Sequence, residues 1–219
     1  MIGFVVSKQT EALSILGDIN NKKQTLIAGK VTIEGTIGLN KVVIIISGTG
    51  KVNAAIATQA IIDHYPKLQL IINYGTATAI SKKLNLGMCY FVKRIIQSDF
   101  NLSCNNSEMG LIEDYDNAMH IISNKYSKII TDEEKTINLA TQDTPPSKDM
   151  IAKLKEQNVY CYDMEGAACL QVCKTNRKPL VCLKAINGRL GDNLAITDKC
   201  NNIAISNLQG EIQALLEAF

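Results

Sequence analysis

The chain is organised around residues Tyr160–Asn193 (YCYDMEGAACLQVCKTNRKPLVCLKAINGRLGDN). It predicts a short strand, a small-residue-rich helix over Gly166–Asn176 and a buried strand over Leu180–Ile186. The acidic residues Asp163 and Glu165 come where the first strand ends, and a polar, glycine-containing loop follows the second. In open α/β sheets the carboxyl ends of strands form the edge where ligands bind, so we expect a site at this edge.

The whole chain is predicted to form one α/β domain spanning residues 1–219. Its 219 residues are 46% hydrophobic, which is enough for one packed core. The net charge is only +2 and the lysines are scattered, so no nucleic-acid partner is expected. No apolar run approaches the roughly 20 residues of a membrane helix. The seven cysteines show no CxxC spacing, and with no signal peptide apparent we expect a cytoplasmic protein that does not bind a membrane.

Alternating segments on both sides of the opening stretch support the α/β class. Short apolar runs bounded by turn residues predict strands at Ile2–Val6, Thr25–Ala28, Lys30–Thr36, Val42–Ile46, Leu70–Asn73, Met88–Ile96 and Thr136–Ala140. Helices are expected at Glu11–Gly17, Val52–His64, Asp116–Ser123, Thr131–Glu134, Ser147–Gln157 and Ile203–Phe219. Ser147 is the expected N-cap of its helix, because a serine hydroxyl accepts from the free N–H groups of the first turn.

Carboxylates are the most credible chemical groups in this chain. Glu11 follows the first strand, Asp163 and Glu165 follow a later one, and Asp192 lies in the next loop. Such a set suits hydrolysis of a glycosidic bond: one carboxylate orients water, another holds sugar hydroxyls, and an acid protonates the leaving group. Spacing alone leaves each of them equally consistent with a solvated loop residue.

The other motifs carry less information. Ser47–Lys51 (SGTGK) matches neither the phosphate loop G-x4-G-K-[ST] nor the dinucleotide fingerprint G-x-G-x-x-G, so a tight turn explains it as well as a binding loop. His64 and His120 have no metal-ligand partner at helical spacing. We therefore expect neither a metal nor a cofactor.

Taken in order, six segments resemble the nucleoside phosphorylase superfamily, and within it most closely the 5′-methylthioadenosine/S-adenosylhomocysteine nucleosidases. MEGAA is the most specific of them, and only about Ser98–Lys135 is unmatched. The segments are Ile2–Val6 with Glu11, Ser47–Ala55, Ile71–Ile80, Leu84–Val92, Tyr162–Ala168 and Pro179–Asn187. This resemblance implies a three-layer α/β sandwich around a twisted mixed sheet, usually as a homodimer.

The resemblance also implies roles for individual residues. Glu11 matches the residue that activates water, and Glu165 the one that binds the ribose hydroxyls. The remaining matches at the sugar and base are Thr49, Thr76, Ala77 and Met164. The phosphorylase branch carries a G-D-P-x-R loop, but here that region reads Val6–Thr10 (VSKQT), and the chain has only three arginines. Water is therefore the expected nucleophile.

Three departures from the family pattern lie around the base. The family's A-[IV]-[ST]-D reads Ala185–Gly188 (AING), so Gly188 stands where the catalytic aspartate is expected and Asp192 lies four residues on. Thr78 and Ala79 replace two glycines, and the usual stacking aromatic falls near Thr144–Pro145.

The resulting hypothesis is an N-ribosyl hydrolase of purine-type nucleosides such as 5′-methylthioadenosine or S-adenosylhomocysteine. Glu11 would position the water, Glu165 would anchor the ribose, and Asp192 or Asn187 would handle the base. Two alternatives stay open at this point. One is a nucleoside-binding protein that has lost the acid, and the other is a phosphate-dependent phosphorylase.

Overall fold

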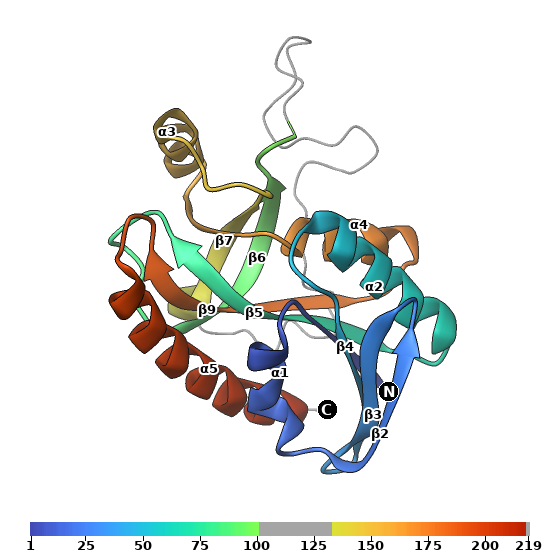
Figure 1. Cartoon of the computed structure of the whole chain (residues 1–219). Coiled ribbons are helices and arrows are strands. Elements are labelled where there is room, and N and C mark those ends of the chain that lie inside the picture. The colour runs from blue at the N-terminus through green and yellow to red at the C-terminus, as the bar shows by residue number, and fades with distance from the viewer. Residues whose placement is uncertain (101–132, 218–219) are drawn as a thin grey trace.

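A nine-stranded mixed sheet forms the centre of the molecule in a computed structural model, which describes residues 1–100 and 133–217 (Figure 1). The strand order among these residues is β2-β3-β4-β1-β5-β8-β7-β6-β9, with a further β5–β9 pairing. The strands are β1 (Ile2–Val6), β2 (Asn20–Ile27), β3 (Lys30–Ile37), β4 (Asn40–Ile46), β5 (Leu70–Ala79), β6 (Cys89–Gln97), β7 (Thr136–Thr141), β8 (Val159–Asp163) and β9 (Leu180–Arg189).

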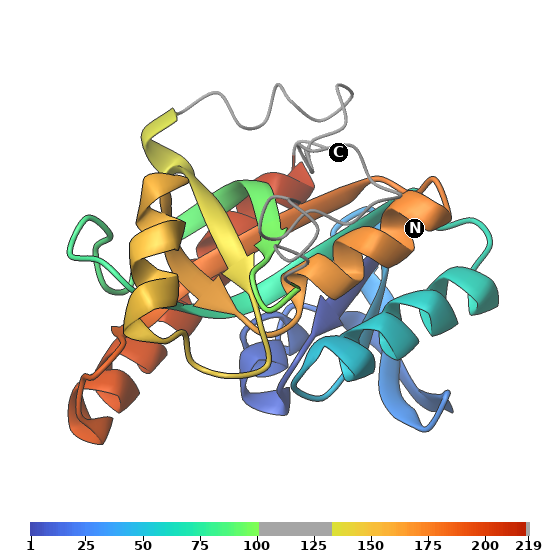
Figure 2. The ribbon, with the colours of Figure 1, turned by 90° about the horizontal axis from the view of Figure 1, so that it is seen from above.

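Helices cover both faces of this sheet, which gives three layers (Figures 1 and 2). Alternate residues of a strand point to opposite faces, so in β1 Phe4 packs into one apolar cluster and Val5 into the other. The Val5 cluster includes α2 (Lys51–His64) and α4 (Gly166–Thr175), whereas the Phe4 cluster includes α1 (Gln9–Leu16) and α5 (Leu194–Glu217). The expected three-layer α/β class is confirmed.

Two helices in the second half of the chain begin after side chains that accept hydrogen bonds from the first turn. The helix α3 (Lys148–Glu156) begins after Ser147, whose hydroxyl accepts from the Met150 N–H at 3.2 Å, as expected. The last helix begins at Leu194, well before the predicted residue 203. Its first turns are largely exposed and lack an apolar stripe, so helical periodicity did not reveal them. The Asn193 side chain accepts from the Ile196 N–H at 3.0 Å in its first turn.

Two strands continue through segments that the sequence predicted as loops. In β5 the tail Tyr74–Ala79 pairs in parallel with β9, which itself runs on through Asn187 and Gly188 to Arg189. The prediction that these segments end their strands was wrong. The backbone groups of the two segments hydrogen-bond to each other, and threonine favours strands. Glycine and asparagine therefore do not interrupt the pairing of β5 with β9.

The remaining expectations concern the middle of the chain. The helix expected at Asp116–Ser123 lies outside the described residues, as does the first half of the one at Thr131–Glu134, and Glu133–Lys135 forms a short 3-10 turn. In the described ranges no helix is long and apolar enough to cross a membrane.

Candidate active site

A pocket lies where the carboxyl-terminal ends of β1, β5, β8 and β9 meet, next to the first turns of α1 and α4. It encloses about 130 Å³ between described residues. This is less than the roughly 300–1,000 Å³ typical of small-molecule pockets. The lining residues are Ser7, Lys8, Glu11, Thr49, Thr76, Ala77, Thr78, Tyr162, Asp163, Met164, Glu165 and Asn187.

Glu11 lines this pocket, is only 4% exposed, and accepts hydrogen bonds from at least four donors. Oε1 accepts from the backbone N–H and the hydroxyl of Thr76, both at 2.8 Å. Oε2 accepts from the Ser7 hydroxyl at 2.7 Å and the Lys8 N–H at 3.3 Å. A side chain on Gly75 would begin 3.0 Å from Oε1, so only glycine leaves room for the carboxylate there. The carboxylate is therefore fixed in one orientation at the pocket.

Glu165 enters the same pocket from the start of α4 and is 6% exposed. Its Oε1 accepts from the Gly50 N–H at 2.9 Å, and Gly50 has a φ of 100°, a conformation natural to glycine. The SGTGK loop thus turns a backbone donor toward Glu165 and presents Thr49 to the pocket. Burial, and after it the nearby Asp163 charge, raises the pKa of Glu165 to about 7.

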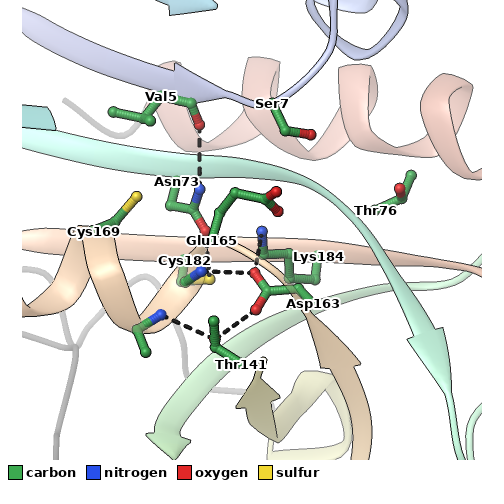
Figure 3. Close-up of polar contacts among 12 residues, drawn as sticks. Val5, Ser7, Asn73, Thr76, Thr141, Asp163, Glu165, Cys169, Cys182 and Lys184 are labelled. Carbon is green, nitrogen blue, oxygen red and sulfur yellow. Dashed lines mark hydrogen bonds and ion pairs between the residues drawn. The ribbon is translucent and has the colours of Figure 1, made fainter. Parts of the chain in front are cut away.

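A buried ion pair lies directly beside Glu165 (Figure 3). The Lys184 ammonium, 1% exposed, lies 2.9 Å from Oδ2 of Asp163. Asp163 also accepts from the Thr141 hydroxyl at 2.6 Å and from the Gly166 N–H at 2.9 Å. Burial opposes the charge of Lys184, but attraction to Asp163 outweighs it and raises the lysine pKa above its ordinary value.

Asn187 is connected to Glu11 through Thr76. The single hydroxyl hydrogen of Thr76 goes to Glu11, so its oxygen accepts from Nδ2 of Asn187 at 3.2 Å. This orients the amide, and Oδ1 accepts from the Thr78 hydroxyl at 3.4 Å. The β5–β9 register shifts between Ala77 and Thr78, which leaves Asn187 as the extra residue of β9 and aims it at the pocket.

Gly188 and Asp192 do not contribute to this pocket. A side chain built on Gly188 would begin 3.3 Å from the Thr197 hydroxyl of α5, so it would point toward that helix. The Asp192 carboxylate accepts from the Arg189 N–H at 2.8 Å and closes the turn after β9. Of the two residues predicted to meet the base, the structure places Asn187 at the site and Asp192 outside its lining.

Comparison with known proteins places the chain among its relatives. A family model described as the phosphorylase superfamily matches residues 3–217, nearly the whole chain. The chain belongs to the phosphorylase superfamily. The matched residues include both Glu11 and Glu165 of the pocket.

Individual known proteins resemble the chain in sequence or in fold. A 5′-methylthioadenosine/S-adenosylhomocysteine nucleosidase of Bacillus cereus (strain G9842) is 28% identical over 200 residues, covering 85% of each chain. The fold matches a nucleosidase of the same description from Colwellia psychrerythraea, solved in complex with adenine, with a TM-score of 0.89, 22% identity and 99% and 94% coverage. It also matches futalosine hydrolase of Helicobacter pylori, with a TM-score of 0.86, 20% identity and 100% and 97% coverage.

Most of the predicted site residues of this superfamily member do meet in the pocket: Glu11, Thr49, Thr76, Ala77, Met164, Glu165 and Asn187. The sequence reasoning did not single out Ser7, Lys8, Tyr162 or the buried Lys184. Ser7 lies one helical turn before Glu11, and Lys184 is the one charge within the apolar run LVCLKAI. A charge in such a run needs a buried partner, and that signal could have found it. Thr144 and Pro145 are exposed and do not line the pocket.

Proposed function

We propose that this protein is a nucleosidase, an N-ribosyl hydrolase that cleaves the glycosidic bond of purine nucleosides of the 5′-methylthioadenosine or S-adenosylhomocysteine class. The observation that carries the proposal is the convergence of Glu11 and Glu165, both deeply buried, on one pocket at the carboxyl edge of the sheet. The chemistry named for the Bacillus cereus relative is consistent with it.

In this mechanism Glu11 orients a water molecule and removes a proton as the water oxygen bonds to the anomeric carbon. Glu165 accepts hydrogen bonds from the ribose hydroxyls and stabilises the positive charge that develops on the sugar. The bond to the base nitrogen breaks, and its electron pair leaves with the base. Met164 and Thr49 would contact the sugar, and Thr76 and Ala77 would lie between the sugar and the base.

For the base we favour Asn187 over Asp192, because Asn187 lines the pocket. An amide donates and accepts hydrogen bonds but does not give up a proton at ordinary pH. The leaving base then takes its proton from solvent. General-acid help is worth typically about 10²–10⁴-fold, so turnover of adenine nucleosides should be slow, and a base that leaves readily should be preferred.

Water is favoured over phosphate as the nucleophile. The described lining contains three carboxylates, Glu11, Asp163 and Glu165, and its only cationic side chain is Lys8. A bound phosphate dianion would need more positive charge than one lysine supplies beside those carboxylates.

The proposal is tested by incubating the protein with 5′-methylthioadenosine, S-adenosylhomocysteine, inosine and futalosine, with and without phosphate, and separating the free bases. Release without phosphate supports the nucleosidase. Strict phosphate dependence would indicate a phosphorylase. Saturable binding without release would indicate a binding protein.

Assembly and location are further proposals that rest on the resemblance. We expect a single-domain homodimer in the cytoplasm. Light scattering on the purified protein would measure its mass, and a monomer at working concentrations would contradict the dimer.

A further inference from the structure

The buried pair of Lys184 and Asp163 has no place in the proposed chemistry, although it lies against the sugar site. Lys184 extends from the middle of β9 through an otherwise apolar stretch, and its ammonium points toward the carboxylates of Asp163 and Glu165 (Figure 3). Burying a charged lysine is costly and persists only where a partner compensates it. The feature therefore needs an explanation beyond packing.

Two carboxylates in one buried site repel each other, and without a cation one of them would hold a proton. Asp163 and Glu165 are two residues apart on the same turn, and both are less than 10% exposed. Lys184 lies at ion-pair distance from Asp163 and also attracts Glu165. With Lys184 present both carboxylates can be ionised, and the cluster of Lys184, Asp163 and Glu165 then carries one net negative charge.

The other groups around this cluster are neutral donors, thiols and more distant charges. Thr141 and the Gly166 N–H fix Asp163, and the Gly50 N–H fixes Glu165. Glu11 and Lys8 face Glu165 across the pocket. The thiols of Cys161, Cys169 and Cys182 lie close by, but burial raises their pKa values so far that they stay neutral.

We propose that Lys184 is a positioning residue for the sugar site: by neutralising Asp163 it allows Glu165 to carry the negative charge that the developing ribosyl cation requires. The inference rests on the proposed nucleosidase chemistry for its purpose. Its physical content, the control of Glu165 ionisation by Lys184, holds without any substrate.

The test is a titration of the Glu165 carboxyl by carbon NMR on the unliganded protein, with Glu165→Gln to assign the signal. Lys184→Met should raise the Glu165 midpoint by about one pH unit or more, because the repulsion from Asp163 is no longer offset. Asp163→Asn should lower it, because Lys184 then acts on Glu165 alone. Lys184→Arg and the double variant Lys184→Met/Asp163→Asn should stay near the wild-type midpoint.

Opposite shifts in the two single variants, with restoration in the double variant, are not expected from a merely structural pair. Lys184→Met strands a buried carboxylate, so its folding is checked first by circular dichroism. Asp163→Asn keeps an oxygen acceptor for the Gly166 N–H and supplies the second shift if Lys184→Met does not fold. An unchanged midpoint in Asp163→Asn, or shifts of the same sign in both variants, would overturn the inference. The titration needs no turnover, so its result is separate from that of the nucleoside assays.

Discussion

The two sides of the pocket differ in the hydrogen bonds and charges that hold their polar side chains. On the sugar side Glu11 has at least four donors, and Glu165 combines a glycine N–H with a neighbouring ion pair. On the base side a neutral amide, Asn187, makes two longer hydrogen bonds of 3.2 and 3.4 Å to threonines. In the proposed chemistry the oriented carboxylates would face the sugar as it becomes cationic, whereas the base would meet a neutral amide among the described lining residues.

The largest effect should come from removing the charge on the sugar side. Glu165→Gln keeps the shape but loses the negative charge opposite the ribosyl cation, so kcat/KM should fall about 10²–10³-fold. Steady-state rates of base release measure this. Glu156→Gln, an exposed glutamate on α3, is the matched control and should leave the rate unchanged. An equal loss of kcat/KM in Glu165→Gln and Glu156→Gln would show that the effect does not depend on the position of Glu165 in the pocket.

Adding an acid to the base side should supply the general acid that the proposed chemistry lacks. Asn187→Asp places a carboxyl where the amide now lies, and when protonated it can give its proton to the leaving base. We expect an increase in kcat of about 10- to 100-fold, below the best general acids because the site is not otherwise tuned for one. The gain should grow as pH falls, since the new group acts in its protonated form. A decrease at every pH would show that the Asn187 amide is itself required.

The pH profile should report the sugar side. Burial, followed by the charge of Asp163, raises the pKa of Glu165 from its ordinary 4.5 to about 7, and the chemistry needs the ionised form. From pH 6 to pH 8 kcat/KM should therefore rise about tenfold. A flat profile across this range would contradict the assignment of Glu165.

The free energy of unfolding should change with pH in the opposite direction to kcat/KM. Between about pH 4.5 and 7 the unfolded chain releases the Glu165 proton while the folded chain keeps it. The free energy of unfolding therefore falls as pH rises through this window. Denaturant titrations at several pH values measure the slope, and Glu165→Gln should make it shallower.

The smallest effect should come from Asp192. Asp192→Ala removes the acceptor for the Arg189 N–H, which should cost about 1 kcal/mol of stability and leave kcat within about twofold. Thermal melts and initial rates distinguish the two effects. A loss of activity as large as that of Glu165→Gln would make Asp192 the missing acid after all.

The sequence was sufficient to predict the layers and to place Glu11 and Glu165 at one edge of the sheet, because both depend on local patterns. Apolar runs such as Ile2–Val6 identify buried strands, and Glu11 and Glu165 follow strands that end at the same edge. Lys184 was missed because its partner is distant in sequence and only the register of the sheet brings them together. The sequence left Asn187 and Asp192 as alternatives for the base, because a register shift in β9 decides which side chain enters the pocket. Periodicity does not reveal such a shift.

Base release from 5′-methylthioadenosine in phosphate-free buffer, by the wild type and by Glu11→Gln, decides whether the protein is a nucleosidase that uses Glu11 as its base. The proposed chemistry predicts a free base and a free sugar from the wild type, and a loss of about 10²–10³-fold in the variant, because the water loses its base. No release from any nucleoside in the panel, or equal rates in the two proteins, would contradict it.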